Sequence, residues 1–192
     1  MAEVATPARS ARWPIVSWFT VPACSEPQPP FKDYANRTRS SSVRAVQLTD
    51  GDRIRGLLAT YCRLIDAGDF AGVGALMAHA VLKTEDGTVI ATGADEVERL
   101  YAGLVKLHDD GTPGTQHVVA NAIFDEPGVD GTVTVTSTYL VLQALPDVPL
   151  QPIVTGTYVD RFETGEGGLR FAERRFGIGR SGRLEHHLTI TP

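Results

Sequence analysis

The chain has 192 residues, which suits one well-buried core with an appendage and is short for two ordinary domains. Hydrophobic residues make up 42% of it and charged residues 21%, which excludes a collagenous or wholly disordered protein. The net charge is −5, and no stretch gathers Lys and Arg among aromatic residues, so we expect no nucleic-acid partner. No run approaches the roughly 20 apolar residues that cross a bilayer, so we expect no membrane span.

The N-terminal quarter differs in composition from the rest. Residues 1 to about 47 are rich in Pro, Ser, Ala and Arg and carry no helical or strand period, so we interpret 1–47 as a disordered arm and 48–192 as the folded domain. Two arginines, the apolar run Trp13–Val21 and then Cys24 loosely resemble a lipoprotein signal. Because Pro14 interrupts this short run, we expect a cytoplasmic protein, with an exported lipoprotein anchored through Cys24 as the alternative.

Helical patterns begin directly after the arm. Thr49 offers an N-cap with Asp52 three residues on, and apolar residues follow at helical spacing up to Ala67-Gly68. Asp69 can then cap a second, short helix over Phe70–His79. The sequence therefore predicts two consecutive helices that meet at a glycine corner.

The pattern then changes from helical to extended. A short strand near Val81–Thr84 and a further extended stretch at Thr88–Ile90 precede a third helix over Ala94–His108. The later segments are rich in Val, Thr, Tyr, Phe and Ile and are separated by turns with Gly or Pro: Gln116–Phe124, Thr132–Ala144, Ile153–Glu163, Leu169–Phe176 and Leu184–Ile190. Helices first and strands afterwards predict an α+β fold, with a curved sheet folded over the helices.

Four segments carry a family resemblance: Leu64–Phe70 at the end of the first helix, Thr115–Val119, Gly156–Phe162 and Leu169–Arg175. In their order and spacing they resemble the nuclear transport factor 2-like superfamily, with its SnoaL-like and scytalone dehydratase-like domains. The resemblance implies a cone in which three N-terminal helices pack against a strongly curved, mostly antiparallel sheet. It further implies a pocket for a small apolar or aromatic ligand, no cofactor, and assembly as a homodimer.

Scytalone dehydratase offers the nearest comparison of mechanism. Its pocket aspartate lines up with Asp66, and the histidine of its Thr-Gln-His segment lines up with His117. Its second catalytic histidine, however, falls on Gln143, and the tyrosine before its aspartate falls on Ile65. The same dehydration is therefore not expected here.

The candidate catalytic residues are Asp66 and His117. An acid near the C-terminus of a helix is disfavoured by the helix dipole, so Asp66 needs a compensating partner. We expect it to orient His117, whose other ring nitrogen would move a proton; the alternative is a solvated acid at a helix corner. The two-residue strand period also places Asn121 and Ile123 on the face of His117. The predicted ligand-binding residues are Tyr61, Asn121, Tyr139, Gln143 and Tyr158.

Other polar clusters indicate structure rather than chemistry. His186 and His187 would point to opposite faces of a strand, so we expect no metal site. Arg174 and Arg175, with Glu173, are interpreted as ion pairs on an exposed face. The leading hypothesis is a small-molecule lyase or isomerase that uses a His-Asp pair. The alternative is a non-catalytic ligand-binding or assembly subunit of the dioxygenase β kind.

Overall fold

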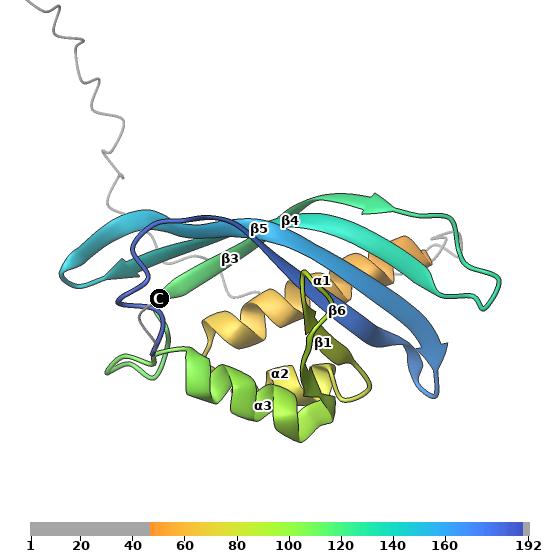
Figure 1. The fold of residues 1–192 in the computed structure, drawn as a ribbon, viewed down its shortest axis with the longest axis horizontal. Coiled ribbons are helices and arrows are strands. Elements are labelled where there is room, and N and C mark those ends of the chain that lie inside the picture. The colour runs from red at the N-terminus through yellow and green to blue at the C-terminus, as the bar shows by residue number, and fades with distance from the viewer. Residues whose placement is uncertain (1–46, 190–192) are drawn as a thin grey trace, which may run out of the picture. The chain divides into compact units, whose positions relative to one another are not determined.

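The structure, a computed structural model, describes residues 47–189. Three helices, α1 (Asp50–Asp66), α2 (Phe70–Leu76) and α3 (Gly93–Leu104), lie on one side of a curved sheet (Figure 1). The six strands are β1 (Val81–Thr84), β2 (Val89–Thr92), β3 (Thr115–Phe124), β4 (Val133–Leu145), β5 (Val148–Gly165) and β6 (Gly168–Ser181). The predicted arm, with Cys24, lies outside the described residues.

The two predicted helix starts are confirmed at the level of their caps. Thr49 and Asp52 form a reciprocal capping box at the start of α1, and Asp69 accepts a hydrogen bond from the Gly72 N–H at the start of α2. Between the helices, Gly68 has a φ of 72°, a left-handed conformation that glycine adopts without a steric penalty. This corner ends α1 at Asp66, which fixes the position of the candidate acid.

The sheet is mixed and has the strand order β2-β1-β6-β5-β4-β3. Strands β3 to β6 run antiparallel to one another, and β1 pairs with β2 antiparallel and with β6 in parallel. Strand β3 therefore lies at an edge, with α1 packed beside it on the inner face of the sheet. The predicted α+β fold with a mostly antiparallel sheet is confirmed.

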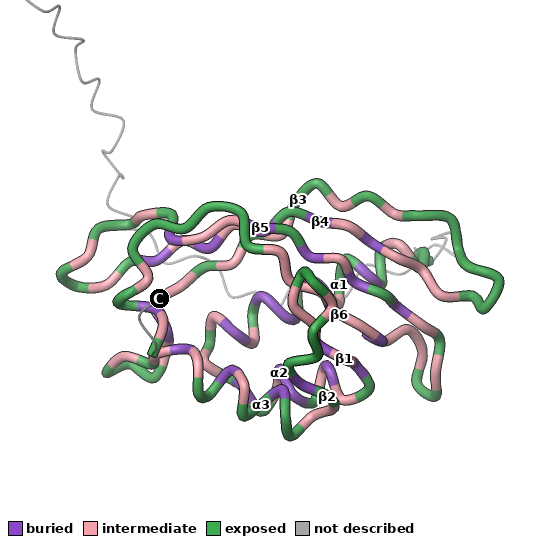
Figure 2. Tube along the Cα trace, viewed as in Figure 1, coloured by how far each residue is buried: buried purple, intermediate pink, exposed green. Residues whose placement is uncertain are grey.

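Burial alternates along the long strands, as Figure 2 shows. On β4, every second residue from Val135 to Gln143 is buried, while the residues between them are more exposed. The core is completed by the inner face of α1, including Ile54 and Tyr61. Burial on β4 thus follows the two-residue period of a strand, with the buried side facing the helices.

The predicted strand Leu184–Ile190 is wrong over its described part. The chain forms a turn there, in which the His187 N–H donates to the Leu184 carbonyl at 2.9 Å. Leu188 then bridges to Val105 just beyond α3, which ends four residues earlier than the predicted helix to His108. The turn changes the direction of the side chains of this segment from that expected of a strand.

Candidate functional site

Asp66 and His117 are in direct contact. Asp66 Oδ1 lies 2.6 Å from His117 Nδ1, and Asp66 Oδ2 accepts the backbone N–H of His117 at 2.8 Å. The His117 side chain is 5% exposed and that of Asp66 is 20% exposed, so the pair lies largely out of water. The predicted spatial pairing is therefore present.

The carboxylate has a third donor that the sequence analysis missed. The hydroxyl of Thr115, at the first position of β3, donates to Asp66 Oδ1 at 2.8 Å. A carboxylate at a helix C-terminus gains no support from the dipole, and these three donors supply it instead. The acid at this helix corner is therefore bound by side-chain and main-chain donors of β3.

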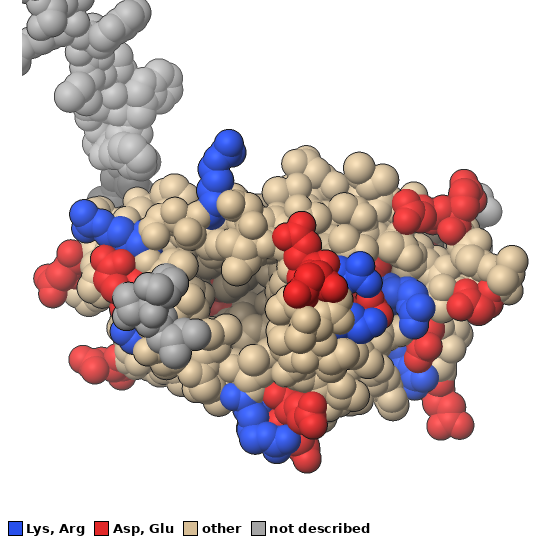
Figure 3. Space-filling view, viewed as in Figure 1, with Lys and Arg blue, Asp and Glu red and all other residues tan. Residues whose placement is uncertain are grey.

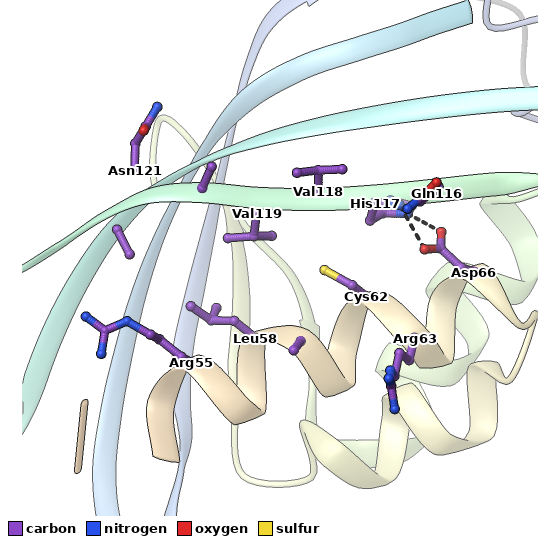
Figure 4. Close-up of a pocket in the computed structure, with 13 residues that line it drawn as sticks. Arg55, Leu58, Cys62, Arg63, Asp66, Gln116, His117, Val118, Val119 and Asn121 are labelled. Carbon is purple, nitrogen blue, oxygen red and sulfur yellow. Dashed lines mark hydrogen bonds and ion pairs between the residues drawn. The ribbon is translucent and has the colours of Figure 1, made fainter. Parts of the chain in front are cut away.

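A groove of about 590 Å³ lies between α1 and the edge strand β3 (Figure 4). The Asp66–His117 pair is at one end of it, and Arg55 is at the other. Its lining includes Leu58, Cys62 and Val119. Cys62 is buried, and burial raises the pKa of its thiol to about 11, so it remains a neutral apolar surface at pH 7.

The prediction that Asn121 and Ile123 share the face of His117 is wrong. The pairing of β3 with β4 shifts between Ala120 and Ile123, and Asn121 has a φ of 53°. This bulge inserts one extra residue, so Ile123 points outward and is 65% exposed. Asn121 stays on the rim of the groove, with its side chain directed away from α1 in Figure 4.

Three predicted ligand-binding tyrosines form part of the aromatic core and do not line this groove. Tyr139 and Tyr158 stack with ring centroids 4.2 Å apart, and the Tyr61 ring meets Tyr158 edge-on at 6.0 Å. Gly156 is required beneath this stack, since a Cβ there would lie 2.5 Å from the Tyr139 ring. Burial raises the pKa of Tyr139 to about 12, so its hydroxyl stays protonated.

The interpretation of Arg174 as an exposed residue is also wrong. Its side chain is fully buried and forms a bidentate pair with Asp160, at 2.6 and 2.8 Å. The guanidinium carbon lies 4.2 Å from the Tyr61 ring centroid and 4.1 Å from that of Tyr158. Burial lowers the pKa of Arg174 and the Asp160 carboxylate raises it, with the second effect prevailing. Arg175, by contrast, does lie at the surface, beside Glu173.

Gln143 is completely buried at the inner side of the sheet. Its Nε2 donates to the Pro113 carbonyl at 3.0 Å and to the His186 carbonyl at 3.2 Å. Its Oε1 has no hydrogen-bond partner among residues 47–189. Gln143 stands where the resemblance places a second catalytic histidine. In this chain it connects the loop before β3 to the C-terminal segment through these two hydrogen bonds.

His187 is a residue that the sequence analysis missed. It is 6% exposed, whereas its neighbour His186 is exposed, because the turn at 185–187 directs His187 inward. Burial, followed by the charge of nearby His117, lowers the pKa of His187 to about 4, so its imidazole is neutral at pH 7. The adjacent histidines His186 and His187 were the signal in the sequence that could have indicated this residue. Because we expected a strand there, we assigned the two histidines no role in the site.

The described residues hold no cluster suited to a metal ion. Within 47–189, no group of three or more His, Cys, Asp or Glu side chains is arranged to bind one. None of the three described helices is long and apolar enough to cross a membrane. The polar groups described at the candidate site are the Asp66–His117 pair, Thr115, Gln143 and His187.

Comparison with known proteins gives a family match over most of the chain. The family model described as the SnoaL-like domain matches residues 46–175. No curated protein sequence matches the chain.

Solved structures share the fold. An NTF2-like protein with a cystatin-like fold from Novosphingobium aromaticivorans is 20% identical, with a TM-score of 0.55 over 67% of this chain and 81% of the other. A candidate scytalone dehydratase from that bacterium is 19% identical, with a TM-score of 0.52 over 67% and 83%. The β subunit of a candidate aromatic-ring-hydroxylating dioxygenase, also from that bacterium, is 17% identical, with a TM-score of 0.51 over 71% and 94%. At these identities the comparisons establish the fold alone.

Proposed function

The chain belongs to the SnoaL-like domain family, and on this premise we propose that it is a lyase or isomerase that moves a proton on a small apolar molecule. His117 carries the proton and Asp66 holds His117 in position. The observation that supports this most is the 2.6 Å contact between Asp66 Oδ1 and His117 Nδ1 in a mostly buried setting. One candidate scytalone dehydratase has the same fold, which is consistent with such chemistry.

The contact determines which ring nitrogen reacts. A carboxylate only accepts hydrogen bonds, so Nδ1 of His117 carries the hydrogen and Nε2 carries the lone pair. The bonds to Asp66 use Nδ1 and the backbone N–H, and they leave Nε2 as the ring nitrogen available to a substrate. It takes a proton from a carbon next to a carbonyl group, whose oxygen takes up the electron pair as an enolate, and Asp66 stabilises the imidazolium that forms. The imidazolium then returns the proton at a second position or to a leaving hydroxyl.

The surroundings suit an apolar substrate. Leu58, Cys62 and Val119 offer apolar surface along the groove, and the charged groups lie at its two ends. Binding sites for small molecules commonly combine apolar walls with a few polar groups that fix orientation. The ligand class that the sequence suggested, small and apolar or aromatic, agrees with this lining.

Carbon-acid exchange on a surrogate substrate tests this proposal. A cyclic aromatic ketone such as 2-tetralone is incubated with the protein in D₂O, and proton NMR follows the loss of the hydrogens next to its carbonyl group. Exchange by the wild type should exceed the buffer rate, and His117→Gln should return it to that rate. His79→Gln, a change at an exposed histidine outside the groove, is the matched control. Exchange that survives in His117→Gln would refute the proposal.

A non-catalytic ligand-binding or assembly subunit is the second candidate. The observation that favours it is the core around Arg174, where an ion pair and aromatic rings occupy space that a ligand would need. The dioxygenase β subunit among the similar structures has the same fold. In that case the wild type would bind 2-tetralone, or a partner subunit, without accelerating exchange.

A further inference from the structure

Two polar atoms beside the Asp66–His117 pair are buried and have no hydrogen-bond partner within residues 47–189. They are Oε1 of Gln143 and Nδ1 of His187. Burying such atoms unpaired is costly, and native structures rarely leave them so. We infer that His187 and Gln143 form a second, polar part of the site, which binds a hydroxyl group of an otherwise apolar ligand. This inference rests on the proposed function, because it assumes a ligand next to His117.

The orientation of Gln143 is fixed by its partners. Both acceptors of its amide nitrogen are backbone carbonyls, those of Pro113 and His186, so the amide cannot be flipped without losing both bonds. Oε1 is therefore a buried hydrogen-bond acceptor in a fixed position, and no donor among residues 47–189 bonds to it. A ligand group that satisfies it must carry a hydrogen-bond donor.

The position of His187 is fixed by the backbone of the C-terminal turn. Its N–H donates to the Leu184 carbonyl at 2.9 Å, and its carbonyl accepts the Lys106 N–H at 2.8 Å. Thr189 N–H then donates to Leu104 at the end of α3, also at 2.9 Å. These bonds attach the turn to α3, so the buried imidazole is held by main-chain contacts.

Both residues lie next to His117. In the ladder between β3 and β4, His117 pairs with Val141 and Thr115 pairs with Gln143, so Gln143 is the diagonal neighbour of His117 on the inner face. Nε2 of Gln143 donates to the His186 carbonyl at 3.2 Å, which places the turn that carries His187 beside Gln143. Figure 3 shows the surface hollowed between the sheet and α3 on this side of the molecule.

A hydroxyl group suits both atoms. It can donate to Oε1 of Gln143, and it can accept from or donate to Nδ1 of His187, depending on the tautomer of that neutral ring. A carboxylate or phosphate does not fit, because it would face the Gln143 acceptor with a negative charge. The ligand class is therefore a phenol, an enol or an alcohol on an apolar ring system.

A pair of probes that differ by one hydroxyl group tests this inference. NMR titration measures the affinity of the full chain for 2-tetralone and for 6-hydroxy-2-tetralone. We expect the wild type to prefer the hydroxylated probe by about 10-fold, which is the effect of one satisfied hydrogen bond. His187→Leu should remove this preference, His187→Asn should retain part of it, and the control His79→Leu should leave it unchanged.

The melting temperature of the His187→Leu variant distinguishes a role of His187 in ligand binding from a role in packing. Since Nδ1 of His187 is unpaired, an apolar residue of similar size should leave the melting temperature of the free protein equal or higher. A preference lost in His187→Leu without loss of stability supports the inference. No preference in the wild type, an unchanged preference in His187→Leu, or no binding of either probe overturns it.

The two proposals can fail separately in these experiments. A hydroxyl preference without carbon exchange would refute proton transfer by His117 and leave the inference about His187 standing. Exchange of both probes without any preference would support His117 and refute the polar part of the site.

Discussion

Asp66 holds His117 by its main chain as well as by its ring. One carboxylate oxygen lies 2.6 Å from Nδ1 of the imidazole, and the other accepts the backbone N–H of the same residue at 2.8 Å. The acid therefore cannot move away from the ring without also breaking a backbone contact. A base fixed in this way has one defined tautomer and one defined direction of attack.

This relationship predicts that the two residues act as one unit. Asp66→Asn should lower carbon exchange about 100-fold, because the amide can no longer both hold the tautomer and stabilise an imidazolium. His117→Ala should abolish exchange, and the double variant should be no worse than His117→Ala alone. The four proteins are compared by exchange rate in D₂O. Additive losses would mean that the two residues act separately.

Much of the site could be predicted from the sequence because it depends on local signals. The capping residues and the glycine corner position Asp66 at the end of α1, and the strand period points His117 toward it. The bulge at Asn121 could not be predicted, because nothing in the strand pattern marks a residue that adopts a positive φ. The direction of every side chain beyond it depends on that one insertion.

Long-range packing accounts for the other differences. Arg174 follows a glutamate and precedes a second arginine on β6, which is typical of a solvated strand, yet its partner Asp160 meets it from β5 inside the core. His187 is buried only because the C-terminal turn attaches to α3. Neither the Arg174–Asp160 pair nor the attachment of the C-terminal turn to α3 can be predicted from local sequence patterns, because each joins segments that are distant in the sequence.

The buried pair predicts a distinctive stability pattern. Asp160→Ala should lower the free energy of unfolding by about 3–5 kcal/mol, because it leaves the Arg174 guanidinium buried without its counter-ion. The double variant Asp160→Leu/Arg174→Met should recover most of that loss. Urea unfolding gives the values, with Glu163→Ala as the control at a half-exposed pair with Arg170, where about 1 kcal/mol or less is expected. A double variant as unstable as Asp160→Ala would contradict this account.

The outer face of the sheet predicts self-association. Across β3 to β5 the middle of this face is formed by uncharged residues, and the exposed Arg161 lies farther along β5; the uncharged residues are Val118, Ala120, Thr138, Leu140, Leu142, Thr155 and Thr157. Such an uncharged surface is suited to a second copy of the chain. Light scattering should give twice the 20.7 kDa mass, and Val118→Lys should shift it toward the monomer. Val129→Lys, at a fully exposed position between β3 and β4, is the control, and a monomeric wild type at high micromolar concentration would contradict the prediction.

His187 predicts a loss of stability in mild acid. Its pKa is about 4 in the folded protein and 6.5 in an unfolded chain, so the unfolded state binds the proton first as the pH falls. The stability associated with the neutral ring is complete above pH 6.5 and is lost progressively down to about pH 4. Between pH 7.5 and pH 5 this single residue should cost about 2 kcal/mol.

The matched variant for this measurement is His187→Leu, which has no ring to protonate. Urea unfolding of both proteins at pH 7.5 and pH 5 yields the difference in their pH dependence, and other titrating groups cancel when the two proteins are compared. The wild type should lose about 2 kcal/mol more than the variant. An equal loss in both would contradict the prediction, because it would mean that burial leaves the pKa of His187 near its ordinary value of 6.5.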